Sequence, residues 1–358
     1  MPTTDIGFGF IGTGMAGMTN AQELLHVDGG ELVAVCSRRE DTVREFARVH
    51  DVRNWYTDYE KLLADPRVDV VCVLSPSGLH RDMAVAAARA GKHVVVEKPL
   101  EINLRRADEI IAACKHEGVK LAVIFQMRFG SVAREVKKAI ASGALGKIFL
   151  ADVIDKGGRQ PAYYESAAWR GTKALEGGGC TMTQSIHPID LIEYLVGPIA
   201  SVFARVATSR HSIEVEDTTT ALLRFAGGGM GTLVSTTSVK PALKSRLEIH
   251  GEKGTIIANA QYDKFLVWDV DGYPSPAPVE PSFDFLDIDD PWAFPQIRHR
   301  VQLQDMVDAI REGRDPVLSG EEARRSLAVI MAIYESSRTG QEQFLSAPEY
   351  APVVPPEP

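Results

Sequence analysis

Short apolar runs alternate with amphipathic helical patterns through the first 125 residues, and this alternation constrains the fold more than any other feature. The apolar runs are rich in β-branched residues and read IGFGFIG, LVAVCS, VDVVCVLS, HVVVEKP and KLAVIF. Helical patterns such as HRDMAVAAARAG and NLRRADEIIAACKHEG separate them. Continuous apolar strands joined by helices are typical of a parallel sheet that is covered on both faces. The sequence therefore predicts a doubly wound α/β domain over residues 1–125.

The pattern changes after Phe125. A helical stretch at Val132–Ala141 is followed by the runs SVFARVAT, TTTALLRF, GTLVSTTSV and SRLEIHG, separated by the glycine turns AGGGMG and GEKG. Such turns suit hairpins better than crossover helices, so residues 126–345 are predicted to form an α+β domain with a mostly antiparallel sheet. The Pro- and Asp-rich stretch Asp271–Pro295 is predicted to be a long loop. Helices are expected near Arg300–Glu312 and Glu321–Arg338, which are candidates for packing back on the N-terminal domain. Residues 346–358 are expected to be a disordered tail.

Composition narrows the class of protein. A formal net charge of −9 argues against a nucleic-acid partner, which needs a basic face. The four cysteines are far apart with no C-x-x-C pair, so we expect reduced thiols in a cytoplasmic protein and no metal site. The N-terminus has no basic segment followed by an apolar one, and no apolar run reaches the ~20 residues that span a membrane.

The segment GTGMAG follows the first predicted strand and carries a G-x-G-x-x-G pattern at Gly12, Gly14 and Gly17. In a βαβ unit, these glycines permit the tight turn, the close approach of a pyrophosphate and close helix–strand packing. The helix N-terminus that follows then faces the phosphates. The sequence predicts a dinucleotide site here that also includes Thr13, Met15 and Ala16.

The residues about 20 positions further along decide between NAD and NADP, because an acidic side chain there accepts the ribose hydroxyls of NAD. Counting from Gly17 leads to Ser37, which is followed by Arg38 and Arg39. Arginine binds phosphate through two parallel hydrogen bonds, so this segment favours the 2′-phosphate of NADP. NAD remains the alternative, with the two arginines as a solvated start of a helix.

The valine run in HVVVEKPL ends directly in Glu97, Lys98 and Pro99. Ligands of open α/β sheets bind beyond the carboxyl ends of the strands, so these charges are expected to line the site and not the core. The segment SPSGLH also follows a predicted strand, and it makes Ser75, Pro76 and His80 candidate cofactor contacts.

Three segments in this order, GFIGTGMAG, EKPL and EGGGCTMTQSIHPIDLIEYLVG, resemble the Gfo/Idh/MocA oxidoreductase family. The resemblance covers most of the chain. It implies an N-terminal Rossmann domain, a C-terminal open-faced sheet that also mediates assembly into a homodimer or homotetramer, and NAD(P)-dependent chemistry on sugars or cyclitols. It also implies that Lys98 points at the reacting oxygen, while Glu97 is expected to face the cofactor because of its place at the carboxyl end of the strand.

His187 matches the histidine of the family's D-x-x-x-H motif, but Thr183 stands where the family often has aspartate. A threonine hydroxyl can hydrogen-bond a substrate and cannot act as a carboxylate base. The i, i+4 spacing places both residues on one face if the segment is helical. An imidazole needs almost no tuning to exchange protons near pH 7, whereas a lysine needs a shift of ~3 pKa units. We therefore expect His187 to be the acid/base and Lys98 to orient the substrate oxygen.

Further site residues follow from the resemblance. Gln126 and Arg128 match positions near the nicotinamide and the substrate, and PAYYESAAWRGTKALEGGG forms a loop by the active site. In that loop Trp169 and Arg170 are expected to clamp the cofactor or stack on the sugar. Tyr163 and Lys173 are expected to contact the substrate, and Lys173 is suited to a carboxylate or phosphate.

The sequence thus predicts an oxidoreductase that transfers a hydride between nicotinamide and a hydroxyl or ketone carbon of a sugar, cyclitol or sugar derivative. Two alternatives stay open. One is a redox-neutral enzyme of the same family that retains NAD and cleaves glycosides. The other is a non-enzymatic protein that senses NAD(P), which would be expected to lack the pair Lys98 and His187.

Overall fold

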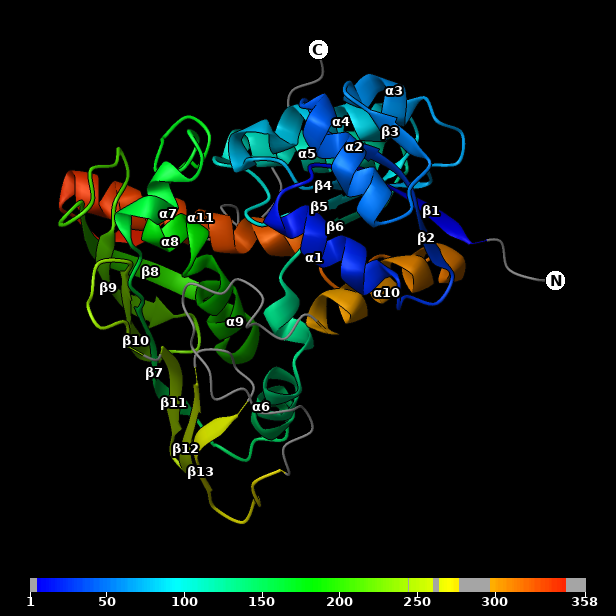
Figure 1. Ribbon diagram of the computed structural model, residues 1–358. Coiled ribbons are helices and arrows are strands. Elements are labelled where there is room, and N and C mark those ends of the chain that lie inside the picture. Colours follow the sequence, from blue (N-terminus) through cyan, green and yellow to red (C-terminus); the bar gives the residue numbers. More distant parts are fainter. Residues whose placement is uncertain (1–4, 244, 260–263, 277–296, 346–358) are drawn as a thin grey trace. The chain divides into compact units, whose positions relative to one another are not determined.

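The computed structural model describes residues 5–243, 245–259, 264–276 and 297–345 (Figure 1). These residues form two compact units. Among the described residues, the first unit contains the chain up to Gln126 and the segment Ile297–Arg324. The second unit contains the described residues from Met127 to 276 and from Arg325 to Leu345. The late segment Ile297–Arg324 therefore belongs with the N-terminal residues, so neither unit is one continuous stretch of chain. The predicted tail and most of the predicted long loop lie outside the described residues.

The first unit is a Rossmann fold, as predicted. Its six strands are all parallel and lie in the order β3-β2-β1-β4-β5-β6. In chain order its elements are β1 (Ile6–Ile11), α1 (Met15–Leu24), β2 (Gly30–Cys36), α2 (Glu40–Val49), β3 (Asn54–Tyr56), α3 (Tyr59–Leu63), β4 (Val70–Val73), α4 (His80–Arg89), β5 (His93–Val96), α5 (Leu104–His116), β6 (Leu121–Val123) and α10 (Ile297–Glu312). The strand order reverses between β1 and β4, which is where such sheets bind ligands.

Helix α10 completes the core of this unit. Its residues Leu303, Met306 and Val307 are buried in the same cluster as Phe8 and Phe10 of β1. The side-chain amide of Gln302 accepts a hydrogen bond from the Phe125 N–H and donates one to the Val123 carbonyl. These bonds satisfy backbone groups at the end of β6 and just after it, and they explain why a distant segment joins the N-terminal residues.

The second unit is built on an eight-stranded sheet in the order β13-β12-β11-β7-β10-β9-β8-β14. Only the β7–β10 pair is parallel, so the sheet is mostly antiparallel, as predicted. The elements are α6 (Ser131–Ala141), β7 (Ile148–Lys156), α7 (Pro161–Glu165), α8 (Cys180–Thr183), α9 (Ile186–Val196), β8 (Ile199–Ala207), β9 (Thr218–Phe225), β10 (Met230–Thr236), β11 (Arg246–Gly251), β12 (Gly254–Asn259), β13 (Phe265–Val270), α11 (Gly320–Thr339) and β14 (Gln343–Phe344). The first turn of α11 is assigned to the first unit.

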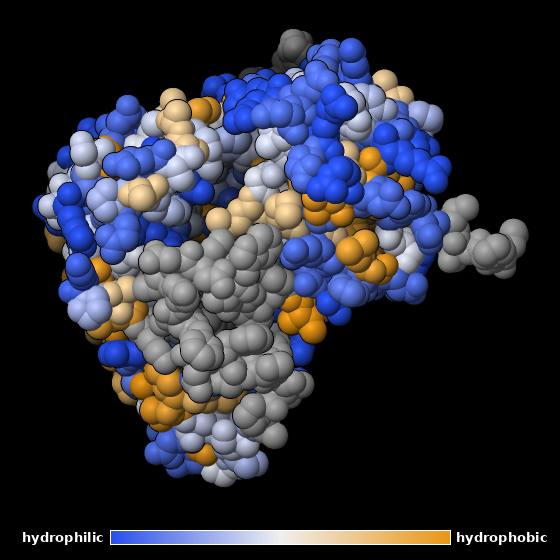
Figure 2. Space-filling view, in the orientation of Figure 1, coloured by the Kyte–Doolittle hydropathy of each residue, from blue (hydrophilic) through white to orange (hydrophobic). Residues whose placement is uncertain are grey.

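The two faces of this sheet differ. Residues alternate between buried and exposed along β9, because successive side chains of a strand point to opposite faces. On the outward face, Leu222 of β9 lies opposite Phe203 of β8, and the two are 60% and 39% exposed. Met230 of β10 is 64% exposed. Most of the surface in Figure 2 is hydrophilic, with apolar side chains exposed in separate places. None of the helices in the described residues is long and apolar enough to cross a membrane.

Candidate active site

The glycine turn after β1 has the geometry that a dinucleotide requires. Gly12 has φ +128°, and a side chain there would lie 2.5 Å from the Leu74 carbonyl oxygen. A Cβ on Gly17 would lie 2.4 Å from the Gly12 oxygen, whereas one on Gly14 would meet no atom within 4 Å. The N-terminus of α1 has no side-chain cap. Open space over Gly14 and uncapped helical N–H groups fit a bound pyrophosphate.

The segment after β2 exposes both of its arginines, Arg38 and Arg39. The Arg39 guanidinium lies 2.5 Å from the Asp41 carboxylate in an ion pair, and both side chains are well exposed. Arg38 is also exposed, and it forms no ion pair within the described part of the chain. Of the two arginines, Arg38 is therefore the one whose guanidinium is available to a phosphate.

Glu97 and Lys98 follow β5, at the same edge of the sheet as the glycine turn. Glu97 is half-buried and accepts a hydrogen bond from the Lys98 N–H at 3.0 Å. Burial raises the pKa of Glu97, while nearby Lys98 and a hydrogen bond with Asn20 of α1 lower it. The Glu97 carboxylate therefore joins β5 to the helix that follows the glycine turn.

His80 is buried, which differs from the predicted cofactor contact. Its Nδ1 lies 3.0 Å from the Pro99 carbonyl oxygen and its Nε2 lies 2.8 Å from the Ser75 carbonyl oxygen. Both ring nitrogens thus bind backbone, and burial lowers the pKa of the ring. His80 fixes the turns after β4 and β5, so its support of Ser75, Pro76 and Lys98 is indirect.

Gln126 is the last residue of the first unit and follows β6 closely. Its side-chain oxygen is buried and accepts no hydrogen bond from the described residues. A buried acceptor without a donor is costly unless a ligand supplies one. This orphaned oxygen fits a cofactor that carries amide or hydroxyl donors. Candidate residues therefore follow five neighbouring strands, β2, β1, β4, β5 and β6.

In the second unit, the segment EGGGC packs tightly against Glu216, which lies just before β9. A Cβ on Gly179 would lie 1.6 Å from the Glu216 carbonyl oxygen, so only glycine fits there. The Glu216 carboxylate accepts hydrogen bonds from the N–H groups of Gly179 and Thr181, at 2.8 and 3.0 Å, and from the Tyr334 hydroxyl. Glu216 thus caps α8 from a distant part of the chain.

The segment that carries Thr183 and His187 is not one continuous helix. Helix α8 ends at Thr183 and α9 begins at Ile186, so the predicted i, i+4 relation between Thr183 and His187 is wrong. The Thr183 hydroxyl donates a hydrogen bond to the Gly179 carbonyl at 2.9 Å, four residues earlier in the chain. His187 lies in the first turn of α9, before Pro188, and is half-buried.

Arg128 is buried and bound within the second unit. Its guanidinium donates to both carboxylate oxygens of Asp190 at 2.8 and 2.7 Å, and it stacks on the Tyr194 ring. A guanidinium held in this way has little capacity left for a ligand. We therefore do not retain Arg128 as a substrate contact.

The loop after β7 gathers cations around aromatic rings. The guanidinium carbons of Arg159 and Arg170 lie 4.9 and 4.2 Å from the Tyr163 ring centroid. The Arg170 carbon also lies 4.7 Å from the Trp169 ring centroid. Lys173 is exposed, and its backbone N–H donates to Glu214. The structure thus brings Tyr163, Trp169 and Arg170 together and adds Arg159, which the sequence did not single out.

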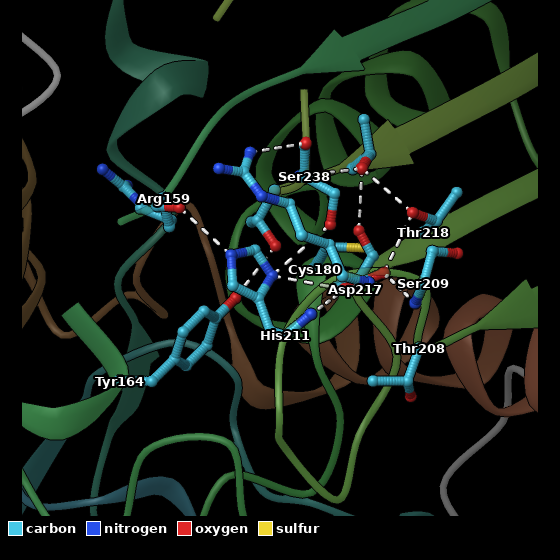
Figure 3. A network of polar contacts seen from close by, with 12 residues as sticks. Arg159, Tyr164, Cys180, Thr208, Ser209, His211, Asp217, Thr218 and Ser238 are labelled. Atoms are coloured by element: carbon cyan, nitrogen blue, oxygen red, sulfur yellow. Dashed lines mark hydrogen bonds and ion pairs between the residues drawn. The ribbon is translucent and has the colours of Figure 1, made fainter. Parts of the chain in front are cut away.

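A polar network supports this loop (Figure 3). Asp217 accepts hydrogen bonds from the N–H groups of Ser209, Arg210 and His211 at 2.8 to 2.9 Å. Burial alone would raise the pKa of Asp217, but these donors outweigh it and lower the pKa to about 2. The His211 ring lies between Asp217, 3.2 Å from Nδ1, and the Arg159 carbonyl, 3.1 Å from Nε2. Sequence reasoning missed this pair because no local pattern marks it.

The four cysteines are all free and buried. Burial raises the pKa of Cys36, Cys114 and Cys180 to about 12. Since the thiolate is the reactive form, these side chains take no part in the proposed chemistry.

Comparison with known proteins agrees with this architecture. Residues 6–125 match the model of an oxidoreductase family with an NAD-binding Rossmann fold, and residues 133–257 match the GFO/IDH/MocA C-terminal domain. The chain therefore belongs to the Gfo/Idh/MocA oxidoreductase family, whose members act on CH–OH groups.

Individual relatives are similar over almost their whole length. The chain is 28% identical to myo-inositol 2-dehydrogenase of Thermotoga maritima, covering 92% of this chain and 95% of that protein. It is 27% identical to scyllo-inositol 2-dehydrogenase (NAD+) of Bacillus subtilis, covering 92% and 93%. Among solved structures, it matches the WlbA dehydrogenase of Bordetella pertussis in complex with NADH and UDP-GlcNAcA at 32% identity. That match has a TM-score of 0.85 and covers 96% of this chain and 99% of the other.

Proposed function

We propose that this protein transfers a hydride between a nicotinamide cofactor and a hydroxyl-bearing carbon of a sugar or cyclitol. The glycine turn carries this proposal, because the open space over Gly14 beside an uncapped helix fits a dinucleotide. The cyclitol and sugar-nucleotide relatives support the substrate class. Glu97, Ser75, Pro76 and Gln126 are the further residues that we assign to the cofactor, beside Thr13, Met15 and Ala16.

His187 is the proposed acid/base, and Lys98 the proposed oxygen-orienting group. In the oxidative direction a nicotinamide bound at the glycine turn would supply the hydride acceptor, and His187 would take the hydroxyl proton as the C=O bond forms. An ammonium group beside the oxygen stabilises the negative charge that develops there. The division of roles follows from ordinary pKa values of ~6.5 for imidazole and ~10.4 for lysine.

The test compares His187→Gln and Lys98→Met in the oxidation of myo-inositol or of any sugar that proves active. We expect kcat to fall about 10²- to 10⁴-fold for His187→Gln, the range of general acid–base catalysis. The affinity for NADH, measured by fluorescence titration, should stay within about twofold for this variant. A His187→Gln enzyme that keeps its kcat would show that the proton goes elsewhere.

The cofactor is proposed to be NADP, with NAD as the alternative. Arg38 is exposed and forms no ion pair with the described residues, which suits a 2′-phosphate beside Ser37. Side-by-side titration with NADPH and NADH should show tighter NADPH binding, and Arg38→Ala should remove the difference. Arg39→Ala is the matched control, because the Arg39 guanidinium is already paired with Asp41. Equal or tighter NADH binding by the wild type would contradict the NADP assignment.

The protein is also proposed to be a homo-oligomer in the cytoplasm. The outward face of the second unit's sheet exposes Phe203, Leu222 and Met230, and exposed apolar groups on neighbouring strands suit an interface between copies. Four free thiols are typical of a reducing compartment.

A further inference from the structure

Two carboxylates lie opposite each other on the outward face of the second unit's sheet. Strands β7 and β11 are neighbours in the middle of this sheet (Figure 1), and Asp152 of β7 is the direct cross-strand partner of Glu248 of β11. Like charges that face each other in this way destabilise an antiparallel pair of strands. A cation between the two carboxylates would replace this repulsion by attraction.

The protein itself supplies one positive charge to this pair. The Arg246 guanidinium forms an ion pair with Oε1 of Glu248, whereas Asp152 forms no ion pair with any residue that the structure describes. Oδ1 of Asp152 instead accepts hydrogen bonds from the N–H and the hydroxyl of Thr232, at 2.7 and 2.6 Å. Oδ2 of Asp152 and Oε2 of Glu248 therefore accept no hydrogen bond within the described part of the chain.

His250 brings a nitrogen atom to the same place. It lies two residues after Glu248 on β11, so the two side chains point to the same face. The Nε2 of His250 lies 3.6 Å from Oε2 of Glu248. One atom from each of Asp152, Glu248 and His250 lies within 4.8 Å of the other two. Two ligands of one tetrahedral Zn²⁺ are ~3.4 Å apart, so small side-chain rotations can bring all three atoms to one ion.

Each of the three side chains is oriented by a polar partner on the same face of the sheet. In the order of the three residues, these partners are Thr232, Arg246 and Thr255. The Thr255 hydroxyl lies 2.9 Å from Nδ1 of His250, which leaves Nε2 directed toward the carboxylates. Outer hydrogen bonds of this kind are typical of protein metal sites. The three side chains are half-buried, so an ion can reach them from solvent.

We propose that Asp152, Glu248 and His250 bind one divalent transition-metal ion of the Zn²⁺ type. Carboxylate oxygen and imidazole nitrogen are ordinary zinc ligands, and an imidazole favours zinc over Mg²⁺ and Ca²⁺. The site uses none of the cysteines, on which the expectation of no metal site rested. All three ligands come from two neighbouring strands of one chain, so metal binding depends neither on assembly nor on the proposed hydride transfer. The bound ion joins β7 to β11.

The test is calorimetric titration of the untagged full-length protein with ZnCl₂ and MgCl₂, after metal has been removed with EDTA and the EDTA by dialysis. We expect about one Zn²⁺ per chain with a Kd below about 10 μM, and binding of Mg²⁺ at least about tenfold weaker. His250→Gln should weaken Zn²⁺ binding at least about 100-fold, because a ligand is lost. Thr255→Val removes only the outer hydrogen bond and should weaken Zn²⁺ binding about tenfold.

His116→Gln is the matched control. His116 lies on α5 and is exposed, with its Nδ1 3.1 Å from the Glu117 carboxylate, so it pairs an imidazole with a carboxylate outside the proposed site. This variant should bind Zn²⁺ within about twofold of the wild-type affinity. An equal loss of affinity in His116→Gln and His250→Gln overturns the proposal. Binding that is lost in His187→Gln and kept in His250→Gln also overturns it, because the ion would then lie at the proposed acid/base.

Asp152→Asn tests the site in a variant that should keep the fold. The amide oxygen can still accept the hydrogen bonds from Thr232, and removing one of two facing charges should leave the metal-free variant at least as stable as the wild type. Saturating Zn²⁺ should raise the Tm of the wild type by at least about 2 °C, and that of the variant by less than about half as much. Absence of Zn²⁺ binding to the wild type, or an equal rise in Tm in both proteins, overturns the proposal.

Discussion

At the scale of single residues, His80 and Arg128 are two predicted contacts whose polar groups are bound by other groups of the protein. Both stand at positions where the sequence predicted contacts, and both are buried. His80 binds two backbone carbonyls, and Arg128 binds the Asp190 carboxylate at two points. Motif spacing placed both residues next to strand ends or in the predicted loop region, but it could not show that their polar groups are bound by the protein itself, because that depends on which partner the fold brings near.

Glu193 gives a pH-dependent prediction at the same scale. It is buried in α9, and its Oε2 has no hydrogen-bond partner in the described residues. Burial raises its pKa from 4.5 to about 8. Between these two values the folded chain holds one proton more than the unfolded chain, so the wild type loses stability as the pH rises through this window.

Glu193→Gln should remove this loss. Scanning calorimetry at pH 5 and pH 8 should show the variant gaining on the wild type as the pH rises, by roughly 2–4 kcal/mol in unfolding free energy. The stability difference between the variant and the wild type at pH 5 gives the effect of the substitution on packing alone. A gain that is the same at both pH values would show that Glu193 does not titrate in this range.

At the scale of elements, substitutions in the turn between β1 and α1 should affect cofactor affinity and protein stability to different extents. Alanine at Gly14 meets no atom within 4 Å, so Gly14→Ala should cost under about 1 kcal/mol of stability. Its methyl group enters the space assigned to the pyrophosphate, so NADH affinity should fall at least tenfold. Fluorescence titration and thermal unfolding of the same sample measure both effects.

Gly17→Ala is the matched comparison within α1. Helix propensity alone favours alanine by ~1 kcal/mol, but the new Cβ would lie 2.4 Å from the Gly12 oxygen. A backbone clash outweighs that gain, and we expect net destabilisation of about 1–3 kcal/mol together with loss of NADH binding. If Gly17→Ala were more stable than the wild type, the turn would be able to move away from the new Cβ. Close packing against Gly12 would then not be the reason for glycine at this position.

The elements also show how far local patterns reach. The strands of the first unit follow from apolar runs and their helical spacers, and the glycine turn follows from its place after β1. The break between α8 and α9 does not follow, because Glu216 caps α8 from 37 residues beyond Gly179. The pair Arg159 and His211, 52 residues apart, was missed for the same reason. Contacts between residues so far apart in the sequence depend on the tertiary structure, and the periodicity of apolar residues does not predict them.

At the scale of the whole molecule, assembly can be tested through the outward sheet face. Leu222→Arg places a charge among Phe203 and Met230, and the residue is 60% exposed, so the fold itself should be unaffected. Light scattering after size-exclusion chromatography should show a smaller assembly than the wild type. Leu25→Arg, on a 72% exposed residue of the first unit, is the control. A monomeric wild type, or a variant of unchanged mass, would rule out this face as the interface.

The discontinuous first unit also has a consequence for biosynthesis. A ribosome that has released residues 1–126 has made all six parallel strands but not Leu303, Met306 and Val307, which fill the core beside Phe8 and Phe10. The nascent Rossmann sheet must wait, with part of its apolar surface uncovered, while the whole intervening segment is synthesised. At about 5–20 residues per second this delay lasts roughly ten seconds or more, long enough for a chaperone to bind.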